Sequence, residues 1–335
     1  MPAPGNAREY LEAKRRTDLR SVSRPVFTRF KKLLAAVQAP RVLDAGTGTG
    51  LMIRRLLAIG HSAGLDIWGV DIDPGNCAAA VELIRREMVR KGYGAAVQPS
   101  AGGGSNTPGG YYLEGGPAPS AERGGSSGGA RAKPPVRVRI VCGDFLGKDF
   151  LARTSGAQFD CVTAHAFMDL VPLDGGVERA RTLLRDGGIF YSSINYDGLT
   201  RLLPLFEDRA FEGELLRYYD ETMDRRKKGE RLTGGSRTGS LLFNALEDRG
   251  FEILDYGSSD WQIFPRDHTY RNREKTFLRH LLGFICSENK NNPRVDGRLL
   301  EKWREERLGA VEEARLSLFT HQADVLAVKR GTADG

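Results

Sequence analysis

Glycines and carboxylates that stand where short apolar runs end are the residues of this chain best suited to chemistry. The clearest group is the turn Asp44-Ala45-Gly46-Thr47-Gly48-Thr49-Gly50, between the apolar run 41–44 and a helical pattern over 50–59. Glycines let a backbone approach a ligand closely, and the free N–H groups at a helix start favour polar or anionic ligand groups. The dinucleotide-binding fingerprint would need glycine at position 51, where Leu51 stands, so this turn predicts a different ligand.

Two more acids end apolar runs farther along the chain. Asp71 closes the run 67–71, and Asp144, followed by Phe145, comes after the β-branched run 136–142. If these runs are parallel strands, their carboxyl ends meet at one edge of a sheet.

The runs belong to an alternation of strands and helices that predicts a doubly wound, mostly parallel α/β sheet. Apolar segments of strand length predict seven strands, at 41–44, 67–71, 136–142, 159–163, 188–193, 252–254 and 323–329. Apolar residues at helical spacing predict helices at 26–37, 50–59, 76–91, 175–184 and 238–249.

In this order, the motifs resemble those of class I S-adenosylmethionine-dependent methyltransferases, which implies a Rossmann-like methyltransferase fold. Asp44, Gly46, Gly48 and Gly50 resemble the family motif D-x-G-x-G-x-G, and the resemblance spans residues 38–93 and 136–260 and the last strand. It implies that the second-strand acid pairs with both ribose hydroxyls, and that the third-strand acid accepts from the adenine amino group. The implied S-adenosyl-L-methionine-binding residues are Asp44, Ala45, Gly46, Thr47, Gly48, Gly50, Asp71, Ile72, Asp144, Phe145 and Ala164.

Methyl transfer from a sulfonium is an in-line displacement in which the donor carries the reactivity, so the protein mainly aligns donor and acceptor. No fixed catalytic residue is required, and candidates are sought by position. His165 and Asp169 follow the fourth strand, in the segment 159–170 that resembles the part of the family lining the methyl donor. His165 is a candidate general base, with a cofactor contact or ordinary packing as the other interpretations.

Candidates for binding the methyl acceptor lie in the later loops and in the N-terminal arm. Asn195 follows the fifth strand, where a turn or helix cap is the alternative role. The other candidates have structural alternatives too, namely a helix cap, core packing or a solvated surface; they are Arg237, Trp261, His321, Tyr10, Lys14 and Arg20. The basic run 225–228 is interpreted as a solvated helix end.

Composition shifts divide the chain into an N-terminal helical arm, residues 1–38, and a methyltransferase domain, residues 39–335. Residues 94–135 are rich in glycine, proline and serine and predict a disordered insertion, because they cannot bury enough apolar surface. Residues 266–320 carry charged, helical patterns and predict a helical lid over the acceptor, with a packing layer on the sheet as the alternative.

Charge and cysteine usage narrow the class of protein. Residues 1–41 contain ten basic and three acidic side chains, a surplus equal to the net charge of +7 for the whole chain. The rest of the chain has no net charge, which argues against a nucleic-acid-binding surface over the whole chain. We expect the positive charge of the N-terminal segment to lie at the mouth of the active site. Four widely spaced cysteines fit a reducing cytoplasm and predict no metal site. The sequence contains no uninterrupted apolar stretch of 18 residues, so we expect no membrane span.

The sequence therefore predicts a cytoplasmic enzyme that transfers a methyl group to a small-molecule acceptor. An RNA or protein acceptor is the first alternative. A non-catalytic module that binds S-adenosylmethionine and regulates a partner is the second. The oligomeric state and the acceptor atom are left open.

Overall fold

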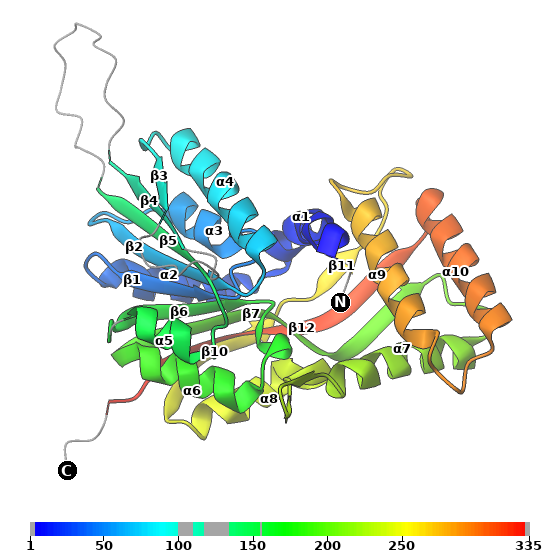
Figure 1. Cartoon of the computed structure of the whole chain (residues 1–335). Helices are drawn as coiled ribbons and strands as arrows, with labels where there is room; N and C mark the ends of the chain where they lie inside the picture. The colour runs from blue at the N-terminus through cyan, green and yellow to red at the C-terminus, as the bar shows by residue number, and fades with distance from the viewer. Residues whose placement is uncertain (1–3, 100–109, 117–133, 155, 332–335) are drawn as a thin grey trace, which may run out of the picture.

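The computed structural model of this protein describes residues 4–99, 110–116, 134–154 and 156–331, and its centre is one large sheet (Figure 1). Among these residues the sheet has ten strands, and its path runs β10-β12-β7-β6-β1-β2-β5-β4-β3, with β11 paired to β12. The parallel strands are β1 (Arg41–Ala45), β2 (Leu65–Asp71), β5 (Val136–Cys142), β6 (Phe159–His165) and β7 (Leu184–Leu203). The antiparallel strands are β3 (Ala96–Pro99), β4 (Tyr111–Gly115), β10 (Phe251–Ser258), β11 (Trp261–Ile263) and β12 (Ser317–Lys329).

The predicted doubly wound α/β fold is confirmed, and each of the seven predicted strands is present. The expected count of seven is too low, because β3 and β4 extend one edge of the sheet and β11 joins β12. The central strands are almost continuously buried, as in β1 and β6, because helices cover both faces of the sheet.

Two apolar clusters, one on each face, hold the helices to the sheet. The first includes Phe30, Ile53 and Ile84, from α2 (Arg24–Ala36), α3 (Leu51–Ile59) and α4 (Pro74–Arg90). The second includes Phe150 and Val177, from α5 (Lys148–Thr154) and α6 (Leu173–Leu183), and is completed by α8 (Thr238–Glu247). In Figure 1 α3 and α4 lie above the sheet and α5, α6 and α8 below it.

The strand order reverses direction at β1. From β1 the chain continues to β2 and β5 on one side, and it then returns to place β6 and β7 on the other. In open α/β sheets, ligands bind in the crevice outside the carboxyl ends of the strands at such a switch point. The glycine-rich turn after β1 and the segment after β6 therefore flank the expected crevice.

The insertion 94–135 does not follow its prediction throughout. Residues 96–99 and 111–115 form the antiparallel pair β3–β4, which adds to the edge strand β5. The expectation of disorder is wrong for these residues, because backbone pairing to an existing edge needs little apolar side-chain surface. The rest of the insertion, 100–109 and 117–133, lies outside the described residues.

Strands β7 and β12 are longer than predicted and continue to pair beyond the edge of the sheet at which the other parallel strands end. Their ladder reaches Ser317 opposite Leu203, so Asn195 lies inside β7 and not after a shorter fifth strand. The chain has three additional helices in this region, α7 (Arg209–Asp224), α9 (Glu274–Asn289) and α10 (Gly297–Glu312), and α9 packs against both α7 and α10. Two of these, α9 and α10, lie within the region 266–320, whose last residues, 317–320, belong to β12.

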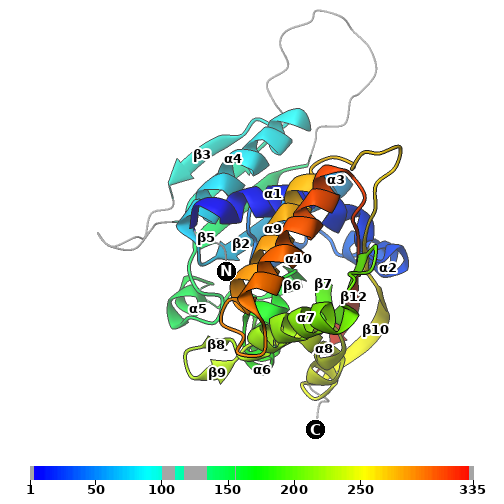
Figure 2. The ribbon, with the colours of Figure 1, turned by 90° about the vertical axis from the view of Figure 1, so that its right-hand side faces the viewer.

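The helix α1 (Pro4–Ser21) of the N-terminal arm lies across the edge of the sheet formed by the carboxyl ends of the parallel strands. It contacts α9 and β11, and Figure 2 shows α1 beside α9. No helix of the described part of the chain is long and apolar enough to cross a membrane. All four cysteines are free and buried.

Candidate active site

Three glycines with left-handed backbone shape the turn after β1. Gly46, Gly48 and Gly50 have φ angles of +65°, +52° and +79°, which side chains with a Cβ rarely adopt. A Cβ on Gly46 would come within 2.0 Å of the Phe167 ring, and one on Gly50 within 2.9 Å of Ile84. The turn thus needs glycine for close approach as well as for backbone conformation.

Asp71, at the end of β2, is bound directly to this turn. Its Oδ2 accepts a hydrogen bond of 2.8 Å from the backbone N–H of Gly48, and its Oδ1 accepts one of 2.9 Å from the N–H of Asp73. The Asn76 amide also donates to Oδ1, at 3.3 Å. Burial raises the pKa of Asp71 above its ordinary value, against the effect of these donors. The turn after β1 and the acid that ends β2 therefore lie in direct contact.

Asp44 faces inward and holds the turn from behind. Its two carboxylate oxygens accept hydrogen bonds from the hydroxyls of Thr47 at 2.7 Å and Thr163 at 2.8 Å. The residue is 1% exposed, and this burial raises its pKa to about 6. Asp44 therefore fixes the shape of the turn through its buried carboxyl group.

The third acid, Asp144, follows β5 and is only half-buried. It accepts a hydrogen bond from the N–H of Leu146, and Lys228 forms an ion pair with it. Lys228 comes from the small hairpin of β8 (Lys227–Lys228) and β9 (Arg231–Leu232). The interpretation of the run 225–228 as a solvated helix end is thus wrong for Lys228, which reaches into the site.

Aromatic rings lie between the turn and the third acid. Phe145 is buried and makes an edge-to-face contact with Phe167, with ring centroids 5.7 Å apart. Phe167 in turn lies against Gly46. Ile72, the residue after the second acid, is 65% exposed and free of such packing.

His165, at the end of β6, uses both ring nitrogens within the protein. Nδ1 lies 2.8 Å from the hydroxyl of Ser193 in β7, and Nε2 lies 3.4 Å from Oδ2 of Asp18 in α1. The imidazole is therefore a link between the sheet and the arm. As a general base it would need one of these partners to move away first.

Asp18 collects polar groups from several elements at the centre of the site. It is fully buried and accepts hydrogen bonds from His165 and from the Trp261 indole at 3.0 Å, and it pairs with Lys14 at 3.2 Å. Burial alone would raise its pKa, but Lys14 and His165 hold the pKa of Asp18 below its ordinary value.

The arm also touches the glycine-rich turn. The side chain of Leu11 would be 3.7 Å from a Cβ on Gly48, and Glu12 accepts a hydrogen bond of 2.7 Å from the Thr49 hydroxyl. Glu12 also pairs with Arg54 of α3 at 3.3 Å. The arm therefore covers the turn on the side of the crevice.

Next to Lys14, aromatic side chains of the arm and of α9 form a cluster. Tyr10 packs on Phe277 and edge-on to Phe284, with ring centroids 5.7 and 5.1 Å apart. The Lys14 ammonium lies 5.7 Å from the ring centroids of both Tyr10 and Trp261. Asp169 is half-buried, and burial raises its pKa while Arg226 and Lys14 oppose the change.

The remaining candidates for acceptor binding lie elsewhere or serve the fold. Arg20 points away from the turn, pairs with Glu274 and donates to the backbone of Gln262. The buried Asn195 side chain is engaged by Ser192 and by the Ala323 carbonyl.

Two more of these candidates are at the surface. Arg237 is exposed, and His321 lies 2.9 Å from Asp260. Trp261 is 8% exposed and packs edge-on against Phe277, with ring centroids 4.9 Å apart. Besides Trp261, only Tyr10 and Lys14 of the proposed acceptor residues therefore lie with Asp18 at the crevice.

Two residues with unusual backbone flank the crevice. Ala166 and Ile194 have φ angles of +49° and +58°, and for a β-branched residue such as Ile194 this conformation is an outlier. The Ile194 N–H donates to the buried carboxylate of Asp324 at 2.9 Å, and the Ala166 N–H donates to the Ser193 carbonyl at 2.8 Å. These bonds fix the chain just after His165 and Ser193.

The described residues fit a nucleoside at the turn. Left-handed glycines bring the backbone close, and the carboxylates of Asp71 and Asp144 are only half-buried at its two sides. A carboxylate has about four acceptor positions, so Asp71, with three donors, retains one. Within the described ranges, no group of three or more His, Cys, Asp or Glu side chains is placed to hold a metal ion.

No protein-family model matches this sequence, and no curated protein matches it. Solved structures do resemble the chain. One is a provisionally named methyltransferase of Bacillus halodurans, with 13% identity over 90% of this chain and 98% of that one and a TM-score of 0.46.

Two further structures have similar values. A provisionally named sarcosine dimethylglycine methyltransferase of Galdieria sulphuraria has 12% identity over 94% of this chain and 86% of that one, with a TM-score of 0.42. The geranyl diphosphate C-methyltransferase of Streptomyces coelicolor has 9% identity over 91% and 80%, with a TM-score of 0.38. These likenesses are distant, and the function rests on the residues of the site.

Proposed function

We propose that this protein is an S-adenosylmethionine-dependent methyltransferase of class I that acts on a small-molecule acceptor in the cytoplasm. The observation that carries the proposal is the hydrogen bond between the Gly48 N–H and Asp71 at the switch point of the sheet. It brings the glycine-rich turn and the second-strand acid into one cradle, with Asp144 and Phe145 on the far side. This is the arrangement that the resemblance of the motifs implies for the cofactor.

Bound in this cradle, S-adenosyl-L-methionine would supply an electrophilic methyl group on a sulfonium. Asp71 retains one acceptor position for a ribose hydroxyl, and Asp144 can accept from the adenine amino group once Lys228 yields. Lys14 is a cation at the crevice and matches the donor's carboxylate or an anionic acceptor. The arm, through Leu11 and Glu12, excludes water from the turn.

The arrangement of the arm and α9 supports a small acceptor. Phe277 and Phe284 both pack on Tyr10, beside Lys14, so side chains close the acceptor side of the crevice. A small molecule can be enclosed there after a modest movement of α1, whereas a polymer would need the arm to be displaced altogether. We accordingly propose that α1 and α9 together act as the lid.

Calorimetry with S-adenosylmethionine and its demethylated product tests the cofactor assignment. We expect both ligands to bind the wild type and the Asp71→Ala variant to bind roughly tenfold more weakly or worse, because a ribose acceptor is lost. Asp149→Asn, an exposed acid on α5, is the matched control and should bind as the wild type does. No binding of either ligand to the wild type would refute the proposal.

Turnover separates an enzyme from a regulatory binding module. The wild type and Asp71→Ala are incubated with a metabolite extract and donor labelled in its methyl group. Label should appear in a small molecule with the wild type only. Label in RNA or protein would contradict the acceptor class, and cofactor binding with no labelled product would favour the module.

A further inference from the structure

The helix α2 carries four basic side chains and no acid. Several basic side chains on other helices are paired with acids, for example Arg217 with Glu214 and Arg304 with Glu301. Among the described residues, Arg24, Lys31 and Lys32 of α2 have no such partner. The surplus charge predicted for the arm therefore lies largely on α2, outside the crevice.

A hollow of about 320 Å³ lies between the end of α1, the first turns of α2 and the helix α3. Its cations are Arg20, Arg24, Lys31 and Arg55, and no acid lines it. Arg20 already pairs with Glu274, which leaves three cations without a carboxylate partner in the described part of the chain.

Two of the three cations crowd one aromatic ring. The guanidinium carbon of Arg55 is 3.4 Å from the ring centroid of Phe27, and the Lys31 ammonium is 5.5 Å from the same centroid. Two like charges over one ring repel each other, and the ring's attraction for a cation offsets this only in part. An anion bound to both cations would offset the repulsion.

Arg55 also has an unmet hydrogen-bonding need. Its Nη1 is buried and has no hydrogen-bond partner among the described residues. Burial lowers the pKa of the Arg55 guanidinium, which Tyr191 and Asp324 partly oppose. Asp324 is itself engaged by the N–H groups of Ser23 and Ile194. A buried donor on a charged group is costly to leave unpaired, so a phosphate oxygen that reaches Nη1 after a shift of the Arg55 side chain would satisfy this need.

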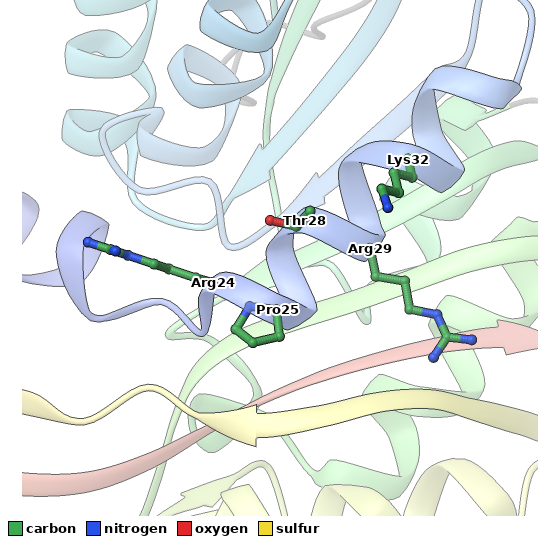
Figure 3. A pocket seen from close by; sticks show the side chains of 5 residues that line it. All are labelled: Arg24, Pro25, Thr28, Arg29 and Lys32. Carbon is green, nitrogen blue, oxygen red and sulfur yellow. The ribbon is translucent and has the colours of Figure 1, made fainter.

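The neighbouring hollow on α2 does not offer the same convergence. It is lined by Arg24, Pro25, Thr28, Arg29 and Lys32, with a volume of about 550 Å³. In Figure 3 the side chains of Arg24 and Arg29 leave the helix in opposite directions. Arg29 is also bonded to the Leu254 carbonyl. Its cations are therefore not directed at one group.

We propose that the hollow between α2 and α3 binds a diphosphate group, from pyrophosphate or from an organic diphosphate. Arg24, Lys31 and Arg55 supply three positive charges, which match the charge of a diphosphate of about −3. The planar fork of Arg55, held against Phe27, suits bidentate contact with phosphate oxygens. Thr28, which also lines the hollow, adds a hydroxyl donor.

This site is distinct from the cofactor cradle and does not depend on the proposed function. Asp18 of α1 faces the crevice through His165, whereas the next residue, Leu19, lines the hollow. The two ligand positions therefore lie on different faces of the end of α1.

Calorimetry of the full chain with sodium pyrophosphate at low ionic strength tests the site. We expect one saturable site, and Arg55→Met, which keeps an apolar side chain on Phe27, should weaken binding roughly tenfold or more. Lys32→Gln removes one charge from the same helix outside the hollow, and its affinity should stay within about threefold. Circular dichroism checks that each variant is folded. Lys31→Gln removes a second cation that lines the hollow and should also weaken pyrophosphate binding.

Three results would overturn the proposal. The first is the absence of saturable pyrophosphate binding to the wild type. The second is an equal loss in Arg55→Met and Lys32→Gln, which would indicate a general effect of charge. The third is tighter binding of a single-stranded RNA oligonucleotide than of pyrophosphate, with Lys32→Gln weakening it as much as Arg55→Met, which would indicate a nucleic-acid surface.

Discussion

Replacing Asp18 by asparagine tests how the arm is held on the crevice. Asp18→Asn keeps the shape of the side chain but removes the negative charge that pairs with Lys14 at 3.2 Å. Both side chains are almost completely buried, with 9% and 0% exposure, so solvent screens the pair little. The variant leaves the Lys14 ammonium buried without its counter-charge.

The expected cost follows from this burial. Removing one partner of a buried ion pair typically costs about 3–5 kcal/mol. If α1 undocks while the sheet stays folded, part of this cost is relieved, so we expect a loss near the lower end, about 3 kcal/mol. Hydrogen exchange should show faster exchange in α1, and urea unfolding should show the lower free energy. Glu9 is also on α1 and forms an exposed ion pair with Arg273. Glu9→Gln, which breaks this pair, should have a much smaller effect.

A double variant decides whether the pair itself is responsible. Lys14→Met together with Asp18→Asn removes both charges, so no isolated charge is left in the interior. The double variant should recover most of the stability that Asp18→Asn loses. The reasoning is refuted if Asp18→Asn costs less than about 1 kcal/mol, or if the double variant is no more stable than the single one.

Two further predictions concern the acids of the cradle. Burial raises the pKa of Asp44 to about 6 in the folded protein, against about 3.9 in the unfolded chain. As the pH rises from 4 to 6, the unfolded chain therefore loses this proton first. The free energy of unfolding should fall by up to about 3 kcal/mol over this range. Urea unfolding at pH 4.5 and 7.5 should show that Asp44→Asn removes this part of the pH dependence; an unchanged dependence would contradict the assignment. Lys228→Ala frees Asp144 from a partly exposed ion pair worth up to about 1 kcal/mol, so calorimetry should show cofactor binding tighter by up to about fivefold, and weaker binding would show instead that Lys228 contacts the ligand.

The sequence was informative where function depends on residues close together in the chain. The turn 44–50 and the acids Asp71 and Asp144 could be predicted because each stands at the end of a recognisable apolar run. The contact of Gly48 with Asp71 then follows from the geometry of parallel strands.

Long-range contacts were beyond such reasoning. Lys228 meets Asp144 across 84 positions, and Asp18 meets His165 across 147, and nothing local in either segment indicates its partner. Asn195 was misplaced for a similar reason. The length of β7 is set by its pairing with β12, so the sequence around Asn195 gives no sign that the strand continues.

The composition of the buried face of α1 explains why a helix can serve as a movable cover. Among its described side chains, the buried residues are Ala13, Lys14, Thr17 and Asp18, of which only Ala13 is apolar. A helix held by burial of apolar surface is difficult to release, because each such side chain contributes about 1.5–3 kcal/mol. Apart from the aromatic contacts of Tyr10, the arm is held by ion pairs and hydrogen bonds, which a ligand's own charges can replace. A donor carboxylate at Lys14 would compete directly with Asp18, so ligand binding and the docking of α1 must be coupled.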